Sequence, residues 1–135
     1  MNPPSKDIVE ILEQSSTGIG YTFGTNMYVG EMPDSPDACI AVYDTGGGQP
    51  APNYTYDYPS IQVLVRGGRA GTTTYKDTWD IAKLVMDALH GLNEETWNGA
   101  RYIQIIANSD IIAVGKDESK RPLFSIHFNI HRTDV

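Results

Sequence analysis

The 135-residue sequence predicts an α+β fold, a single domain in which a mainly antiparallel or mixed β-sheet packs against two α-helices. Two segments carry apolar residues at three- and four-residue spacing, the period of an amphipathic helix. Six other segments are short apolar or alternating runs bounded by Gly, Pro or Asp, which indicate strands. No βα unit repeats along the chain, and this order of elements is typical of the α+β class.

The first predicted helix runs to about Gln14 and places apolar residues on one face. Asn2 can cap this helix with Pro3 at its first position, or Ser5 can cap it one turn later. Three glycines follow the helix, and turns explain them better than a dinucleotide-binding loop, because that motif must follow a strand. The apolar face comprises Ile8, Val9, Ile11 and Leu12.

Three strands are expected in the middle of the chain, at residues 26–31, 38–44 and 61–66. The last of these alternates apolar and polar side chains, so one of its faces should be strongly buried. Between the second and third strands, residues 45–59 contain three Gly, three Pro and three Tyr, and they predict a long exposed loop. The glycines at 46–48 lack the following Lys-Ser/Thr pair and helix of a phosphate-binding loop.

A long helix is expected from Thr74 to a stop at Gly91. His90, in the last turn, should cap the free carbonyls there. The acidic side chains have lysines three or four residues away, which indicates a solvated face. The predicted core stripe is Tyr75, Trp79, Ala82, Val85, Met86 and Leu89, and the charged face is Lys76, Asp77, Asp80, Lys83 and Asp87.

The last third reads as strands at 101–107, 111–115 and 122–131, with residues 116–120 as a hairpin connection between the last two. One face of the final strand is apolar and should join the core, whereas the other is polar and should be wet or form an interface. The apolar face comprises Phe124, Ile126, Phe128 and Ile130, and the polar face Ser125, His127, Asn129 and His131.

Composition excludes several functions. The formal charge of −7 opposes a phosphate backbone, so we expect no direct nucleic-acid binding. The chain lacks a signal peptide and any apolar stretch approaching the ~20 residues that span a bilayer, so we expect synthesis in a host cytoplasm and no membrane contact. The single cysteine, Cys39, lies in an apolar run and should be a buried, reduced thiol.

No residue pattern in the sequence indicates a catalytic residue, a cofactor site or a metal site. His127 and His131 share a strand face about 13 Å apart, which is too far to ligate one ion. No paired acids, Ser-His-Asp set or Cys-His set follows from spacing, although such sets are assembled in space and an enzyme is only weakly excluded. The sequon at 53–55 is incidental without a secretory signal. The tyrosine-rich loop can either contact a partner or pack on its own domain.

From Tyr28 onward, about four-fifths of the chain, the sequence resembles a family of tailed-phage minor capsid and tail terminator proteins. Each matching block alone is a common sequence for a turn or a buried segment, but the order and combination of the blocks are fairly specific. The blocks are GEMPDSPD (30–37), AVYDTGG (41–47), YPSIQV (58–63) followed by Arg66-Gly67, ALHGL (88–92) and KDESKRPLFS (116–125).

The resemblance implies a structural virion protein at the head–tail junction, and not an enzyme. Such a protein assembles as a ring, typically of six copies, on the tail tube protein, ends tube polymerisation and offers a surface to the head connector or stopper protein. The runner-up functions are another head-completion or minor capsid protein, and a small α+β enzyme or ligand-binding domain. A ring requires surfaces that meet head to tail, and the loop and the polar strand face can supply them. The candidate interface residues are Gln49, Tyr54, Tyr56, Tyr58, Arg66, Arg69, His127, Asn129 and His131.

Overall fold

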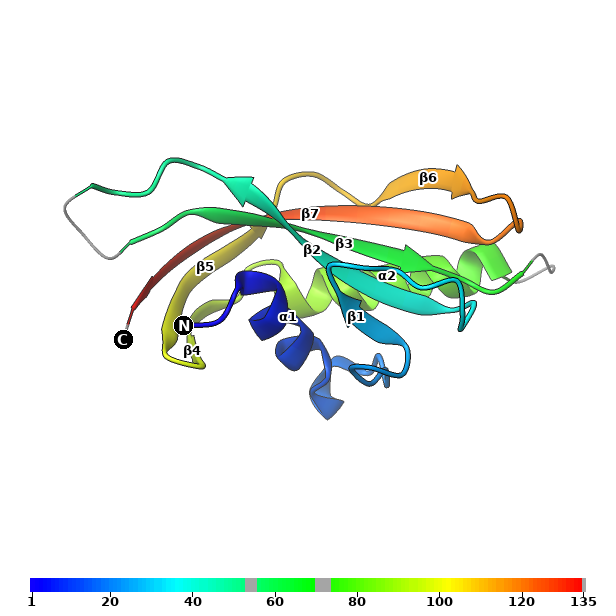
Figure 1. The fold of residues 1–135 in the computed structure, drawn as a ribbon, viewed down its shortest axis with the longest axis horizontal. Helices are drawn as coiled ribbons and strands as arrows, with labels where there is room; N and C mark the ends of the chain where they lie inside the picture. The colour runs from blue at the N-terminus through cyan, green and yellow to red at the C-terminus, as the bar shows by residue number, and fades with distance from the viewer. Residues whose placement is uncertain (53–55, 70–73, 135) are drawn as a thin grey trace.

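The computed structural model describes residues 1–52, 56–69 and 74–134 (Figure 1). A single sheet with helices on one face confirms the predicted α+β class. The elements, in chain order, are α1 (Pro4–Leu12), η1 (Ser15–Thr17), β1 (Met27–Val29), β2 (Cys39–Gly47), β3 (Pro59–Arg66), α2 (Thr74–Leu89), β4 (Asn93–Trp97), β5 (Ala100–Ala107), β6 (Ile112–Lys116) and β7 (Pro122–Asp134).

The sheet is mixed and is organised around β7. Its strand order is β1-β2-β3-β7-β5-β4, and β6 pairs with β7 beside this path. β1 runs parallel to β2, whereas all the other pairs are antiparallel. One margin of β7 pairs with β3, and the other margin pairs first with β6 and then with β5. This 13-residue strand therefore holds both halves of the sheet in register.

The core lies between the sheet and the two helices, both of which cover the same face (Figure 1). In the register, Val63 of β3 faces Ile126 of β7, and Ile105 of β5 faces Ile130. These side chains are at most 2% exposed, and burying each contributes about 1.5–3 kcal/mol. The alternation seen in the sequence of β3 and β7 thus marks the core face correctly. None of the helices in the described ranges has the length and apolar character needed to cross a membrane.

The start of α1 differs from both predicted caps. Pro3 occupies the cap position without a side-chain hydrogen bond, and Pro4 is the first helical residue. Ser5 lies inside the helix, where its backbone N–H and hydroxyl donate to the Asp44 carboxylate at 3.0 and 2.6 Å. A carboxylate from β2 therefore satisfies the helix N-terminus, which is favourable for a negative charge.

Strand β4 was not predicted, because its sequence NEETW is polar and largely exposed. It forms a hairpin with β5 through Asn98 and Gly99, which have φ angles of 51° and 82°. Two consecutive positive φ angles are typical of the tight hairpin turn that Asn-Gly favours. The Asn98-Gly99 dipeptide was the sequence feature from which this hairpin could have been predicted.

The beginning of α2 is less buried than its apolar stripe predicts. Tyr75 is 53% and Trp79 40% exposed, so both were wrongly placed in the core, and Thr78 takes the buried position of the first turns. The tyrosine ring still reaches the margin of the core, 5.1 Å from the ring of Phe124. The buried row of the helix is Thr78, Ala82, Val85, Met86 and Leu89.

The polar predictions for α2 are mixed in outcome. Lys76 bonds Asp80 at 2.8 Å and Lys83 bonds Asp87 at 2.9 Å, which confirms the solvated charged face. His90 does not cap the helix carbonyls. Instead its Nδ1 accepts a hydrogen bond from the backbone N–H of Ala107 at 2.9 Å, which ties the helix end to β5.

Candidate assembly surface

The face of the sheet opposite the helices carries no free charge in its central rows. We call outer face the side chains that point away from α1 and α2. Cross-strand partners place Tyr43, Gln62 and His127 in one row and Ser60, Asn129 and Ile106 in another. The set comprises Tyr43, Ser60, Gln62, Leu64, Gln104, Ile106, Ser125, His127, Asn129 and His131. A face of this composition can approach another protein without desolvating an ion.

Hydrogen bonds between neighbouring strands hold the polar groups of the outer face in place. Gln62 Nε2 donates to Ser125 Oγ at 2.9 Å, and Ser125 Oγ lies 3.2 Å from His127 Nε2. Ser60 Oγ donates to Asn129 Oδ1 at 3.0 Å. Because each bond joins β3 to β7 or runs along β7, these side chains are oriented before any partner arrives.

A hollow of about 530 Å³ opens on the outer face where the β2–β3 hairpin leaves the body of the sheet. The ring of His131 lies on its wall, with the Tyr58 and Tyr56 rings 4.8 and 5.4 Å away. His131 Nε2 is enclosed and finds no hydrogen-bond partner among the described residues. The hollow is lined by Gly48, Tyr58, Ser60, Gln104, Ile106, Asn129, Ile130 and His131, none of them a carboxylate, lysine or arginine.

The described part of the hairpin arm, residues 48–52 and 56–58, is anchored to the body next to this hollow. Asp57 and Arg132 exchange backbone hydrogen bonds of 2.9 and 3.1 Å, and the Arg132 Nε lies 3.2 Å from the Asp57 carboxylate. This anchor fixes the base of the arm and, with it, the position of Tyr58.

Beneath the arm lies a buried polar cluster that joins α1 to the sheet. The hydroxyl of Tyr102 donates to the carboxylate of Asp7, and both side chains are fully buried. Arg132 donates to the same hydroxyl at 3.3 Å, and Asn98 donates to Asp7 at 2.7 Å. Burial, followed by the hydrogen bond to Asp7, raises the pKa of the Tyr102 phenol well above its ordinary value of 10.0.

With this geometry in view, comparison with known proteins identifies the family. A family model described as bacteriophage tail terminator protein matches residues 16–134. The chain belongs to the tail terminator family. The resemblance inferred from the sequence is thereby confirmed, and the protein is a structural protein of the phage virion.

Structural comparison gives the same fold for this tail terminator family member. A chain of the virion of a native gene transfer agent particle matches with a TM-score of 0.72 at 13% identity. The match covers 96% of this chain and 94% of the other, so the two share the whole fold. No curated protein matches the chain.

Five of the candidate interface residues lie in or beside the hollow of the outer face in this terminator fold. Tyr58, Asn129 and His131 line the hollow, Tyr56 packs against His131, and His127 lies on the adjoining outer face. These five residues, which the sequence pattern grouped as interface candidates, are therefore neighbours in the fold. Gln49 lies on the exposed part of the arm, whereas Tyr54 lies outside the described residues.

Arg66 is unsuited to the interface role that its sequence position indicated. Its side chain is buried, and its guanidinium donates to the carbonyls of Pro33, Pro36 and Asp37 at 2.5, 2.8 and 2.8 Å. The arginine therefore holds the 33–37 segment against the sheet. Arg69 is exposed but lies beyond the end of β3, 3.4 Å from the Asp37 carboxylate.

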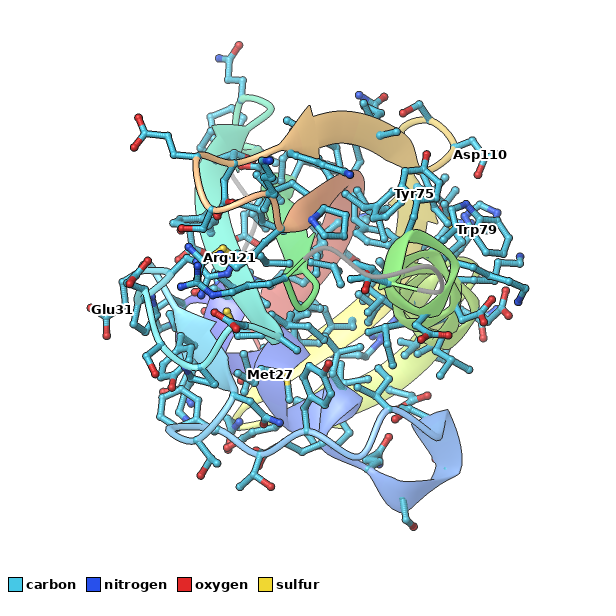
Figure 2. All side chains as sticks on the ribbon, turned by 90° about the vertical axis from the view of Figure 1, so that its right-hand side faces the viewer. Met27, Glu31, Tyr75, Trp79, Asp110 and Arg121 are labelled. Carbon is cyan, nitrogen blue, oxygen red and sulfur yellow. The ribbon has the colours of Figure 1, made fainter. Side chains whose placement is uncertain are left out.

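A second buried arginine, missed by the sequence reasoning, completes this end of the molecule. Figure 2 shows Arg121 on the same side of the molecule as Glu31, and the arginine is 4% exposed. Its guanidinium contacts the carboxylates of Asp34, Asp37 and Asp117 at 2.9, 3.1 and 2.8 Å. The backbone N–H of Arg121 and its side chain hold the pKa of the Asp117 carboxyl below its usual range. The arginine thereby ties the β6–β7 turn to a loop more than eighty residues earlier.

Proposed function

We propose that the protein forms a ring of identical copies, six by family resemblance, at the head–tail junction. There it covers the end of the tail tube, stops further addition of tube protein and presents the docking surface for the head connector or stopper protein. The observation that carries this proposal is the tail terminator family match over residues 16–134. In this role the protein works by geometry, without a cofactor.

The distribution of charge supports an assembly role for the outer face. The chain carries a formal charge of −7, and four of its exposed carboxylates, Asp77, Asp87, Glu94 and Glu95, lie on α2 and β4. Copies that meet through those elements would bring like charges together, which is unfavourable. The outer face and the arm avoid that repulsion. We therefore propose Gln49, Tyr56, Tyr58, His127, Asn129 and His131 as residues that contact the tube or connector.

The test is negative-stain microscopy of lysates from a phage that carries a stop codon early in this gene. We expect overlong, headless tail tubes beside DNA-filled, tailless heads, because nothing stops the tube or joins the head. Supplying the wild-type chain from a plasmid should restore normal particles and serves as the control. Tails of normal length joined to heads in the absence of the chain would contradict the proposal.

Two other outcomes point to the alternatives. Tails of normal length that fail to join heads would indicate another head-completion or minor capsid role. The hollow of about 530 Å³ is large enough for a small molecule, although it contains no charged group to orient one. A rise of several degrees in melting temperature with a member of a metabolite panel would favour a ligand-binding function instead.

A further inference from the structure

The margin of β6 that faces away from β7 is an open strand edge that is apolar over residues 112–114, before a register shift at Gly115 and the terminal Lys116. All five residues of β6 are exposed, with Ile112 at 44% and Val114 at 55%. β6 pairs with β7 alone, and no strand in the described ranges lies along its other margin. An apolar edge of this kind offers free backbone N–H and C=O groups to another chain, and folded proteins usually cover or charge such edges.

The other terminal strands offer less apolar edge to a partner. β4 carries Glu94 and Glu95 on its exposed residues, so its edge is charged. β1 has only three residues. Among the described strands, the contrast singles out β6 as the edge that a partner would cover.

Two aromatic side chains of α2 extend the exposed apolar surface beside β6. Figure 2 shows Tyr75 and Trp79 on the same side of the molecule as Asp110, two residues before the start of β6. The Tyr75 ring packs on Phe124, which is the cross-strand partner of Ala113. A strand added to β6 would therefore find an apolar surface for its inward-facing side chains.

A second free edge lies on the opposite margin of the same sheet. β1 pairs only with residues 40–42 of β2, so no described strand accompanies residues 43–47 on the margin away from β3. This stretch leads into the arm, at the end of the molecule opposite β6 (Figure 1). Its one carboxylate, Asp44, is already engaged by Ser5, and its other residues are uncharged.

We propose that β6 of one copy pairs with residues 43–47 of β2 in the next copy, so that the sheets join head to tail. This inference rests on the proposed ring assembly. A ring needs two different, complementary patches on each subunit, and these two edges have similar length, lie at opposite margins and carry no free carboxylate. Pairing of β6 with β6 about a two-fold axis would stop at a dimer and leave the β2 edge uncovered.

The test uses cysteines introduced by Ala113→Cys on β6 and Thr45→Cys on β2. Each variant is supplied to the stop-codon phage, and the purified tails are treated with a short bis-maleimide, which does not require an exact strand register. Cys39 is fully buried and stays in place. Thr96→Cys on the exposed edge of β4 is the matched control for either partner.

The double A113C/T45C variant should give a ladder of cross-linked species that ends at the ring number. A mixture of the two single variants should give dimers only, and each single variant should remain monomeric. Cross-linking of A113C alone would show a two-fold contact and overturn the inference. A T96C/T45C ladder as strong as that of the test pair would also overturn it.

A labelling measurement guards against variants that assemble poorly. The cysteine of A113C should react with a mono-maleimide at least tenfold more slowly in tails than in the free protein, whereas that of T96C should not change. Tails of normal length with full reactivity of A113C would refute the edge pairing and leave the terminator function standing. Normal tails made without any copy of the chain would refute the function itself.

Discussion

Removal of one hydroxyl, by Tyr102→Phe, should destabilise the fold strongly for so small a change. The phenol donates to the fully buried carboxylate of Asp7 and accepts from Arg132, so the variant leaves both groups with fewer partners. A hydrogen bond to a buried charged group contributes about 2 kcal/mol to stability. For a chain of 135 residues, that loss corresponds to a fall of about 7 °C in melting temperature. Tyr75→Phe removes an exposed hydroxyl and should change stability by less than about 0.5 kcal/mol.

The same variant carries a specific pH dependence. Because the pKa of Tyr102 is raised in the folded state, the unfolded chain loses this proton first, and the wild type loses stability as pH rises above 10. With an unfolded pKa of 10.0, that loss reaches about 1.4 kcal/mol at pH 11. Phenylalanine cannot ionise, so the difference between wild type and variant should shrink by that amount between pH 8 and pH 11. Urea unfolding followed by circular dichroism at both pH values measures it. A constant difference would refute the role assigned to the phenol proton.

Three further perturbations test other contacts. In Gly67→Ala the new Cβ would lie 1.9 Å from Thr78 Oγ1, so the variant should lower the free energy of unfolding in urea by about 1–3 kcal/mol. The control Gly68→Ala meets no atom within 4 Å and should be near neutral. Equal effects of the two substitutions would contradict the packing argument. Asp44→Asn weakens the acceptor at the N-terminus of α1 and should cost about 1 kcal/mol in the same assay, and an unchanged midpoint would count against this tertiary cap. Burial raises the pKa of the Cys39 thiol, so the native protein should react with an aromatic disulfide reagent only as fast as it unfolds, and rapid labelling of the native state would show that the thiol is accessible.

Much of the fold could be predicted because its signals are local. The alternation in β3 and β7 and the helical spacing in α2 each depend on residues that are neighbours in sequence. The α2 stripe failed only at Tyr75 and Trp79, where the helix reaches the margin of the sheet and the surrounding strands no longer cover it. Sequence spacing describes which side of a helix is apolar but not how far the covering layer extends.

The candidate surface was only partly predictable, for a related reason. The polar face of β7 follows from periodicity alone, so His127, Asn129 and His131 were correctly grouped. Arg66, by contrast, looked like an exposed cation at the end of a strand, because its three carbonyl partners lie about thirty residues earlier. The burial of a long polar side chain depends on such distant partners, and a single sequence does not reveal them.

Edge pairing and outer-face contact assign different partners to different parts of the sheet. If neighbouring copies join through β6 and β2, the two faces of each sheet become the two faces of the ring wall. The helices and β4 then form one wall, and the uncharged outer face forms the other. The hollow with its enclosed histidine nitrogen would not be consumed by contacts between copies. It would stay available for a different protein, as the proposed contact with the tube or connector requires.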